Sequence, residues 1–262
     1  MSDNQTENGM KVIVATHKPY WMPMDSMYVP VQVNACSSAP IAGFQPDNLG
    51  ENISEKNPNY CELTALYWAW KNLECDYLGL THYRRYFANR AFGDKKRRIA
   101  GKQDIADALS HADILLPKPR NYFIETNYSQ YVHAHHEQDL LITREILQER
   151  RSESVSKFDE IMRRTYGHRF NMFVMQRDLA DAYCSWLFDV LFELENRLDI
   201  SDYSPNDARV FGFVSERLMD YWVEMNGLAA VEIPVVYLES QHWLKKGSSF
   251  LKRKLGGKHG QR

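Results

Sequence analysis

Residues 52–87 read NISEKNPNYCELTALYWAWKNLECDYLGLTHYRRYF, and they combine the pattern of a helix with the pattern of a strand. Asn57-Pro58 resembles an N-cap followed by proline at the first helical position. Apolar side chains then recur at positions 63, 66, 67 and 70, which fall on one face of a helix. The short apolar run YLGLT at 77–81 indicates a buried strand. The stretch therefore predicts a helix that is followed by a buried strand.

The same alternation extends to both sides of this stretch. Buried strands are expected at residues 10–16, 112–116, 170–175 and 231–238. Helices are expected at 126–150, at 154–166, after 175, and from Ser204-Pro205 to about 222. Residues 17–52 are interpreted as loop with one short strand at most, and residues 88–102, with six Lys or Arg, as a surface loop. Strands that alternate with helices predict an α/β fold with a mostly parallel central sheet flanked by helices.

The composition suits one large domain, since the chain has 262 residues and 44% of them are hydrophobic. We expect a disordered lead-in at 1–9, a single domain at 10–242 and a basic tail at 243–262. The tail carries seven Lys or Arg and no acidic residue, although the net charge of the whole chain is −2, so the body is acidic. No apolar run is long enough to span a bilayer, and the first residues do not resemble a signal peptide. These features predict a cytoplasmic protein. Its tail is either a disordered end or a peripheral contact to the anionic inner leaflet of the plasma membrane.

Several well-known site motifs are missing from the sequence. It contains no GxGxxG after a strand and no GxxxxGK[ST], so dinucleotide-dependent oxidoreductases and P-loop enzymes have no support. It also contains no GxSxG, no HExxH and no Cys/His set with zinc spacing, and this weakens the case for hydrolases.

Cationic and hydrogen-bonding residues stand where the expected strands end. The first strand ends at residues 16–18 (THK), the second at 82–85 (HYRR) and the fourth at 175–177 (MQR). In open α/β sheets the ligand lies beyond the carboxyl ends of the strands. A pocket bordered by such groups and by few acids suits an anionic ligand such as a nucleoside diphosphate.

Two motifs within residues 52–87, ELTALYW at 62–68 and HYRRYF at 82–87, carry a family resemblance. Together they resemble a bacterial family of capsular and exopolysaccharide glycosyltransferases that was long known only as an uncharacterised domain. Further matches are Tyr131-x3-His135-x3-Asp139, FNMFVM at 170–175 and RVFGFVSERL at 209–218, so the resemblance covers most of the chain. It implies transfer of a sugar from a nucleotide-sugar on a GT-A-like nucleotide-binding fold. The implied donor is a UDP-sugar, with galactose in pyranose or furanose form as the candidate sugar. The implied acceptor is a glycan or a lipid-linked sugar in capsule, exopolysaccharide or O-antigen synthesis.

The sequence departs from the GT-A pattern in one respect. GT-A enzymes usually hold a divalent metal through an Asp-x-Asp motif after a strand, and no Asp-x-Asp occurs in this sequence. His82-Tyr83-Arg84-Arg85 stands where that motif is expected. We therefore predict that His82 and the two arginines neutralise the leaving diphosphate without a metal cofactor, with Mg²⁺ or Mn²⁺ as the alternative. Strand alternation places His82 and Arg84 on one face and Arg85 on the other, so a single arginine is expected to contact phosphate directly.

The candidate site residues fall into three groups. Candidates for the donor and its diphosphate are Thr16, His17, Lys18, Ser54, Lys56, Asn57, His82, Tyr83, Arg84, Arg85, Arg209 and His242. Candidates for the acceptor are Glu62, His135, Asn171 and Met172. Glu216 is the first nominee for the base that deprotonates the acceptor hydroxyl, with Asp139 and Asp113 as competitors.

Each candidate also has a purely structural interpretation. Asn57 and Glu62 are accounted for by helix capping and the helix dipole. The arginines at 84 and 85 could form surface ion pairs, and His135 could belong to a hydrogen-bonded helix surface. Arg209 and Glu216 are seven residues apart and could form a structural pair on one helix face.

Two other classes of protein compete with a transferase. Arg, Lys and aromatic residues are mixed at positions 82–98, as in nucleic-acid-binding modules, but the acidic body argues against nucleic acid as a partner. A catalytically silent scaffold of a polysaccharide assembly complex is the other alternative, and loss of a usable base would fit it.

Overall fold

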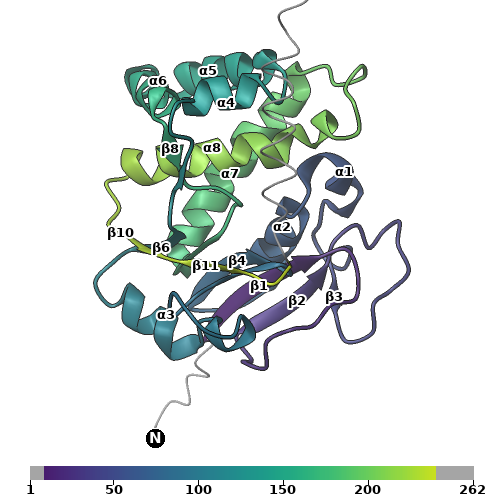
Figure 1. Ribbon diagram of the computed structural model, residues 1–262. Coiled ribbons are helices and arrows are strands. Elements are labelled where there is room, and N and C mark those ends of the chain that lie inside the picture. The colour runs from purple at the N-terminus through teal and green to yellow at the C-terminus, as the bar shows by residue number, and fades with distance from the viewer. Residues whose placement is uncertain (1–8, 240–262) are drawn as a thin grey trace, which may run out of the picture.

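The structure, a computed structural model, describes residues 9–239 and contains one large sheet with helices on both faces (Figure 1). Seven strands follow the order β10-β6-β9-β4-β1-β2-β3, β5 pairs with β4, and β11 pairs with β5. The strands of this sheet are β1 (Met10–Thr16), β2 (Tyr28–Gln32), β3 (Gln45–Pro46), β4 (Tyr77–His82), β5 (Arg85–Phe87), β6 (Ile114–Pro117), β9 (Phe173–Gln176), β10 (Ala230–Ile233) and β11 (Val235–Tyr237). A separate short ribbon pairs β7 (Arg120–Asn121) with β8 (Tyr166–Gly167).

Strand direction determines which residues meet at the edges of the sheet. Strands β1, β2, β3 and β4 are parallel, and β6 and β10 run the same way, whereas β9 is antiparallel to both β4 and β6. The predicted α/β fold with a mostly parallel sheet is therefore confirmed. The carboxyl ends of β1, β2 and β4 lie at one edge, together with the amino end of β9.

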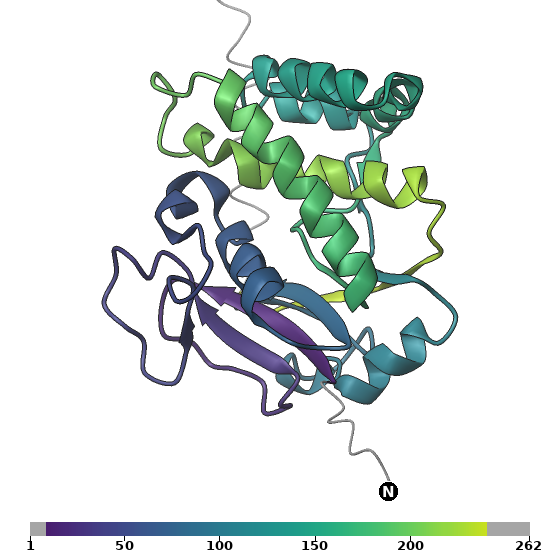
Figure 2. The same ribbon diagram turned by 180° about the vertical axis from the view of Figure 1, so that it is seen from behind.

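The helices form two layers around the sheet and a further helical group beside it (Figures 1 and 2). Helices α2 and α7 pack against one face, and α3 covers the other near β6, while α4, α5, α6 and α8 form the helical group. Their bounds are α1 (Asn57–Tyr60), α2 (Leu63–Asn72), α3 (Lys102–Leu109), α4 (Asn127–Val132), α5 (Glu137–Arg150), α6 (Val155–Arg163), α7 (Arg177–Arg197) and α8 (Val210–Met225). Short 3₁₀ helices cover η1 (Ser54–Lys56), η2 (Lys96–Arg98), η3 (Ser152–Ser154) and η4 (Asp207–Arg209).

The alternation of side chains along β1 divides the core in two. Ile13 and Ala15 belong to the larger apolar cluster, which also contains buried residues of α2, α7 and α8. Val12 and Val14 belong to the second cluster, with Ile105 of α3 and residues of β5 and β11. Because successive strand residues point to opposite faces, one seven-residue strand anchors both layers. None of the described helices is long and apolar enough to cross a bilayer.

Several expected elements are interrupted where the backbone leaves regular geometry. The helix predicted from Asn57 is split at Cys61, whose φ of 54° lies in the left-handed region. Asn57 is not the N-cap of α1, because Lys56 holds that position and makes no side-chain capping bond. The side-chain amide of Asn57 donates instead to the Cys61 carbonyl and the Thr64 hydroxyl. The strand predicted at 231–238 is divided at Pro234 into β10 and β11.

The other differences lie at element ends. The strand predicted at 170–175 begins only at 173, because Phe170 and Asn171 have positive φ values of 77° and 54°. The helix predicted from Ser204 begins at 210, after the 3₁₀ turn η4, and the Ser204 hydroxyl accepts the amide of Asp207. The helix predicted at 126–150 is divided between α4 and α5.

Candidate functional site

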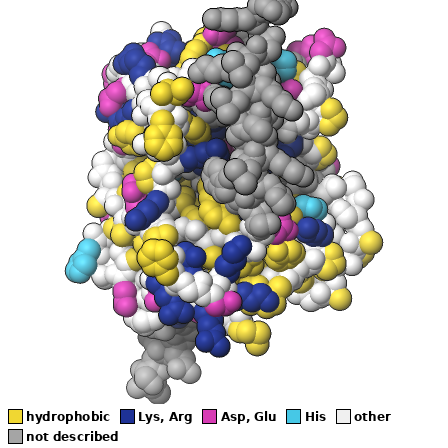
Figure 3. Space-filling view, in the orientation of Figure 1, with side chains coloured by type: hydrophobic (Ala, Val, Ile, Leu, Met, Phe, Trp, Pro, Cys, Tyr) yellow, Lys and Arg dark blue, Asp and Glu magenta, His cyan; other side chains and the backbone are white. Residues whose placement is uncertain are grey.

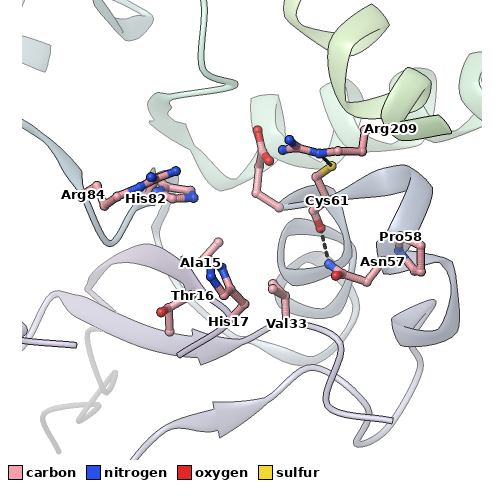
Figure 4. Close-up of a pocket in the computed structure, with 11 residues that line it drawn as sticks. Ala15, Thr16, His17, Val33, Asn57, Pro58, Cys61, His82, Arg84 and Arg209 are labelled. Atoms are coloured by element: carbon pink, nitrogen blue, oxygen red, sulfur yellow. Dashed lines mark hydrogen bonds between the residues drawn. The ribbon is translucent and has the colours of Figure 1, made fainter. Parts of the chain in front are cut away.

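Two adjoining cavities lie at the carboxyl edge of the sheet. The first, of about 340 Å³, is lined by the end of β1, by α1, by the β4–β5 turn and by η4. In Figure 4, Thr16 and His17 lie on the sheet side of this cavity, Asn57 and Pro58 on the α1 side, and Arg209 above Cys61. Residues from position 15 to position 209 of the chain therefore meet in one cavity, as expected for a ligand site at parallel strand ends.

The second cavity, of about 280 Å³, continues from the first toward the helical group. The two share Cys61, Glu62, His82, Arg84 and Arg209, which form the junction between them. Six arginines but only two carboxylates line the second cavity: Arg84, Arg85, Arg120, Arg169, Arg209 and Arg217, with Glu62 and Glu216. Lys and Arg side chains also gather, among apolar ones, on the lower half of the face shown in Figure 3.

The β4–β5 turn carries polar atoms that lack partners. His82 pairs with Arg85 in the hairpin register, so residues 83 and 84 form the turn. The buried atoms Nδ1 of His82, Nε of Arg84 and Nε of Arg85 have no hydrogen-bond partner among the described residues. Arg84 reaches Glu239 with one terminal nitrogen at 3.4 Å and remains partly exposed. Buried donors are nearly always satisfied in native proteins, so these orphans indicate that a ligand completes them.

His82 does not add a positive charge to this turn. Its burial, together with the nearby guanidinium groups of Arg85 and Arg84, lowers its pKa to about 2. The imidazole is therefore neutral at physiological pH in the unliganded protein. The prediction that His82 helps to neutralise a diphosphate is corrected: it can donate or accept a hydrogen bond, and the arginines carry the charge.

Arg209 lies above the junction, on η4. Its Nε donates to the Cys61 sulfur at 3.1 Å, and its guanidinium lies 5.2 Å from the centre of the Phe213 ring. Burial raises the pKa of Cys61 to about 11, so the sulfur remains a thiol. Arg209 and Glu216 both line the second cavity, but they come from different elements, η4 and α8.

Glu62 is a half-buried carboxyl group at the junction. The Asn171 amide donates to its Oε1 at 2.9 Å and also to the carbonyl of Gly212 at 3.2 Å. The Asn171 carbonyl oxygen in turn accepts from the Ser215 hydroxyl at 2.8 Å. Burial raises the pKa of Glu62. Asn171 thus lies behind the cavity and positions Glu62.

Glu216 and His135 also line the second cavity. Oε2 of Glu216 accepts from Nη1 of Arg217 at 3.0 Å, and Nη2 of Arg217 donates to Gln130 at 2.6 Å. His135 stacks on Phe213 with ring centres 4.3 Å apart, and burial lowers its pKa, so its imidazole is neutral. These side chains line the second cavity and not the first, and they offer hydrogen bonds there.

Asp139, the predicted competitor of Glu216 as the base, lines neither cavity. It is 1% exposed, and its two oxygens accept from the hydroxyls of Tyr131 at 2.7 Å and Tyr203 at 2.6 Å. Asp113 is equally unsuited, because it lies at the amino end of β6 and accepts the Ala229 amide. Both carboxylates serve the local backbone and helix packing.

Five other candidates also lie outside the two cavities. Ser54 is buried against Asp47, and Lys56 donates to both oxygens of Glu195 at 2.7 and 2.8 Å.

Tyr83 is 1% exposed and packs against the rings of His17 and Tyr20, and Met172 is part of the second core cluster. Lys18 lies over the Tyr83 ring, 3.7 Å from Glu239. His242 lies outside the described residues.

The fourth predicted strand end is corrected as well. Because β9 runs against its neighbours, residues 175–177 lie at the opposite edge of the sheet from the cavities. Arg177 donates there to the carbonyls of Leu73 and Trp70, both at 2.6 Å. The residues just before β9, not those after it, approach the site.

The sequence did not single out Arg120, Tyr122, Gln130 and Arg169, which line the second cavity. Arg120 follows β6 by only three residues, so the rule that ligands lie beyond strand ends could have found it. The other three belong to no motif and to no strand end of the sheet. Within residues 9–239, no group of three or more His, Cys, Asp or Glu is arranged to hold a metal ion.

Residues 11–227 match the model of a family described as a domain of unknown function (DUF4422). Among solved structures, the fold is similar to the apo structure of WbbM, a bifunctional glycosyltransferase, with 29% sequence identity and a TM-score of 0.82. The similarity covers 89% of this chain and 46% of WbbM, so the chain spans about half the length of that protein. No curated protein matches the chain.

Proposed function

Because this chain belongs to the family described as a domain of unknown function (DUF4422) and shares the fold of one part of WbbM, we propose that it is a glycosyltransferase. It transfers a hexosyl group, with galactose the candidate, from a UDP-sugar to a glycan or a lipid-linked acceptor. The observation that carries the proposal is the β4–β5 turn, where unpartnered nitrogens of His82, Arg84 and Arg85 border a cavity at parallel strand ends. The wider setting that we propose is capsule, exopolysaccharide or O-antigen synthesis.

The two cavities suggest how a donor lies in the site. The first cavity, at the ends of β1 and β2, has the apolar and hydrogen-bonding lining that suits a nucleoside. The diphosphate then reaches the junction, where Arg84 and Arg209 approach from opposite sides. Two fixed guanidinium groups stabilise the negative charge that develops on the leaving diphosphate. In this proposal the arginines perform the task that Mg²⁺ or Mn²⁺ performs elsewhere.

A carboxylate at the junction is required if the transfer inverts the anomeric centre, because the acceptor hydroxyl must lose its proton. Glu62 meets this requirement better than Glu216. It lies at the junction of the cavities, and its raised pKa makes it the stronger base. Glu216 lines only the second cavity and is engaged by Arg217 at 3.0 Å.

A thermal-shift panel of nucleotides and nucleotide-sugars tests the proposal. UDP and UDP-sugars should raise the melting temperature, whereas ADP and a DNA oligonucleotide should not. At a ligand concentration of 100 times Kd, the stabilisation is about 2.7 kcal/mol. Stabilisation by DNA instead would favour the nucleic-acid-binding alternative, and binding without turnover of any UDP-sugar would favour the silent scaffold.

The proposal that no metal is needed has its own test. Sugar transfer measured in excess EDTA should proceed at the rate seen without the chelator. Complete loss of activity that manganese restores would refute direct neutralisation by the arginines.

A further inference from the structure

The second cavity carries more positive charge than one donor diphosphate uses. Of its six arginines, only Arg84 and Arg209 also line the first cavity. The other four line the second cavity alone: Arg85, Arg120, Arg169 and Arg217. A nucleoside diphosphate that extends from the first cavity to the junction leaves these four without a role.

Two of these four arginines contain a buried nitrogen without a partner. Nε of Arg85 and Nε of Arg217 have no hydrogen bond to any described residue. Among the residues that the structure describes, the Arg85 guanidinium has no ion pair, and it lies over the Phe170 ring, 4.4 Å from the ring centre. The Arg217 side chain is only 5% exposed. Burial of unsatisfied charged donors is costly, so these groups indicate an anion that completes them.

The carboxylates of the cavity do not cancel this charge. Glu216 is already the partner of Arg217, and Oε1 of Glu62 already accepts from the Asn171 side-chain amide at 2.9 Å. Arg169 donates to the Tyr122 hydroxyl at 2.9 Å and lies 3.7 Å from Asp220. These contacts fix its guanidinium in the lining of the second cavity. Even with both glutamates ionised, the four arginines that line the second cavity alone exceed them by two positive charges.

We propose that the second cavity is an acceptor subsite that binds a phosphate or diphosphate group carried by the sugar acceptor. The proposal rests on the proposed function, because it takes the first cavity and the junction as the donor site. Guanidinium forks bind both carboxylates and phosphates, but a surplus of two charges exceeds the single charge that one carboxylate supplies. Gln130, Tyr122 and His135 provide the hydrogen-bonding groups that a sugar next to the phosphate requires.

Adjacent arginines in the chain provide a matched pair of variants. Arg84 lines both cavities and Arg85 only the second, so Arg84→Met and Arg85→Met remove equal charge from different subsites. The probe is inorganic pyrophosphate, titrated by calorimetry into protein that is saturated with UDP. Arg85→Met should weaken pyrophosphate binding at least tenfold and change UDP affinity less than twofold. Arg84→Met should weaken UDP binding instead.

Further variants keep the test decisive. Arg217→Met should repeat the effect of Arg85→Met, and if this buried position does not tolerate the change, Arg85→Met and Arg85→Lys decide the question. Arg97→Met removes an exposed arginine of η2 that lines neither cavity, and it should leave both affinities unchanged. Circular dichroism melting confirms that each variant is folded.

Three outcomes are distinguishable. If Arg85→Met weakens UDP and pyrophosphate equally, the arginine belongs to the donor site and the inference is overturned. Tighter binding of glucuronate than of pyrophosphate would overturn it as well, because the site would then be specific for a carboxylate. If no nucleotide binds, the proposed function fails, but an Arg85-dependent pyrophosphate site measured without UDP still supports the anion site.

The same titration identifies the source of the phosphate. Farnesyl diphosphate and inorganic pyrophosphate share the anionic group, and only the first has a lipid chain. Tighter Arg85-dependent binding of farnesyl diphosphate would indicate a lipid-linked acceptor. Equal binding would indicate a phosphate attached to a sugar.

Discussion

Glu62 is the single residue on which the proposed chemistry depends most. It lies at the junction of the two cavities, and Asn171 fixes its Oε1 at 2.9 Å. Substitution of a general base typically costs about 10²–10⁴-fold in rate. Glu62→Gln should therefore lose at least about a hundredfold in kcat and keep its UDP affinity, whereas Glu216→Gln should retain most of its kcat. The measurement is steady-state transfer with a UDP-sugar, and equal losses in both variants would contradict the assignment.

The pKa of Glu62 also predicts an effect on stability. Burial raises the pKa in the folded state, so the free energy of unfolding falls as the pH rises above the pKa of the unfolded chain, and the full penalty is present once the pH exceeds the folded-state pKa. Glu62→Gln removes this penalty and should melt at a higher temperature than the wild type at pH 8. The difference should disappear toward pH 4, where the carboxyl is protonated in the folded protein. A variant that melts lower at pH 8 would show that the carboxylate is stabilising.

Residue chemistry explains which site candidates could be foreseen. Thr16, His17, His82, Arg84 and Arg85 were found because they stand at strand ends, and the structure brings all of them to the cavities. The role of Lys56 could not be foreseen in the same way. Its partner Glu195 is 139 residues away in the chain, and no local pattern reveals that ion pair.

At the scale of elements, short apolar runs specified the strands well. The strand predicted at 10–16 coincides with β1, and that predicted at 77–81 differs from β4 by one residue. The direction of β9 could not be predicted, because a buried strand has the same apolar sequence pattern whether it runs parallel or antiparallel to its neighbours. That one direction moved Arg177 to the far edge of the sheet and brought Asn171 to the site.

The bend before β9 provides a test at this scale. Asn171 has a φ of 54°, and its side chain makes three hydrogen bonds, a partly buried one to Glu62 and buried ones to Gly212 and Ser215. Asn171→Ala should destabilise the protein by about 1–3 kcal/mol, because buried polar groups lose their partners. Asn171→Gly loses the same bonds but adopts the backbone conformation freely, so it should be less destabilised. Urea denaturation measures both, and equal losses would show that backbone conformation contributes little.

At the scale of the whole molecule, charge is divided between an acidic body and the basic segment 243–262, which lies outside the described residues. Each basic residue near an anionic membrane contributes about 1 kcal/mol to binding. The full chain should therefore co-sediment with vesicles that contain anionic lipid, and a chain ending at Lys246 should bind markedly less. Vesicles of neutral lipid are the control. Unchanged binding after truncation would show that the tail is not the membrane contact.

The pairing of β11 with β5 places the end of the described chain beside the proposed donor site. The Leu238 amide donates to the Arg84 carbonyl at 3.0 Å, and the Glu239 carboxylate approaches both Arg84 and Lys18. In the proposed function, Glu239 therefore takes up contacts of Arg84 and Lys18 that the donor phosphate needs, so donor binding begins with the exchange of one anion for another. An exposed ion pair of this kind contributes up to about 1 kcal/mol. Neutralising Glu239 should therefore tighten UDP binding by about fivefold at most. In the proposed function, the weaker affinity of the wild-type protein makes release of the nucleotide product easier.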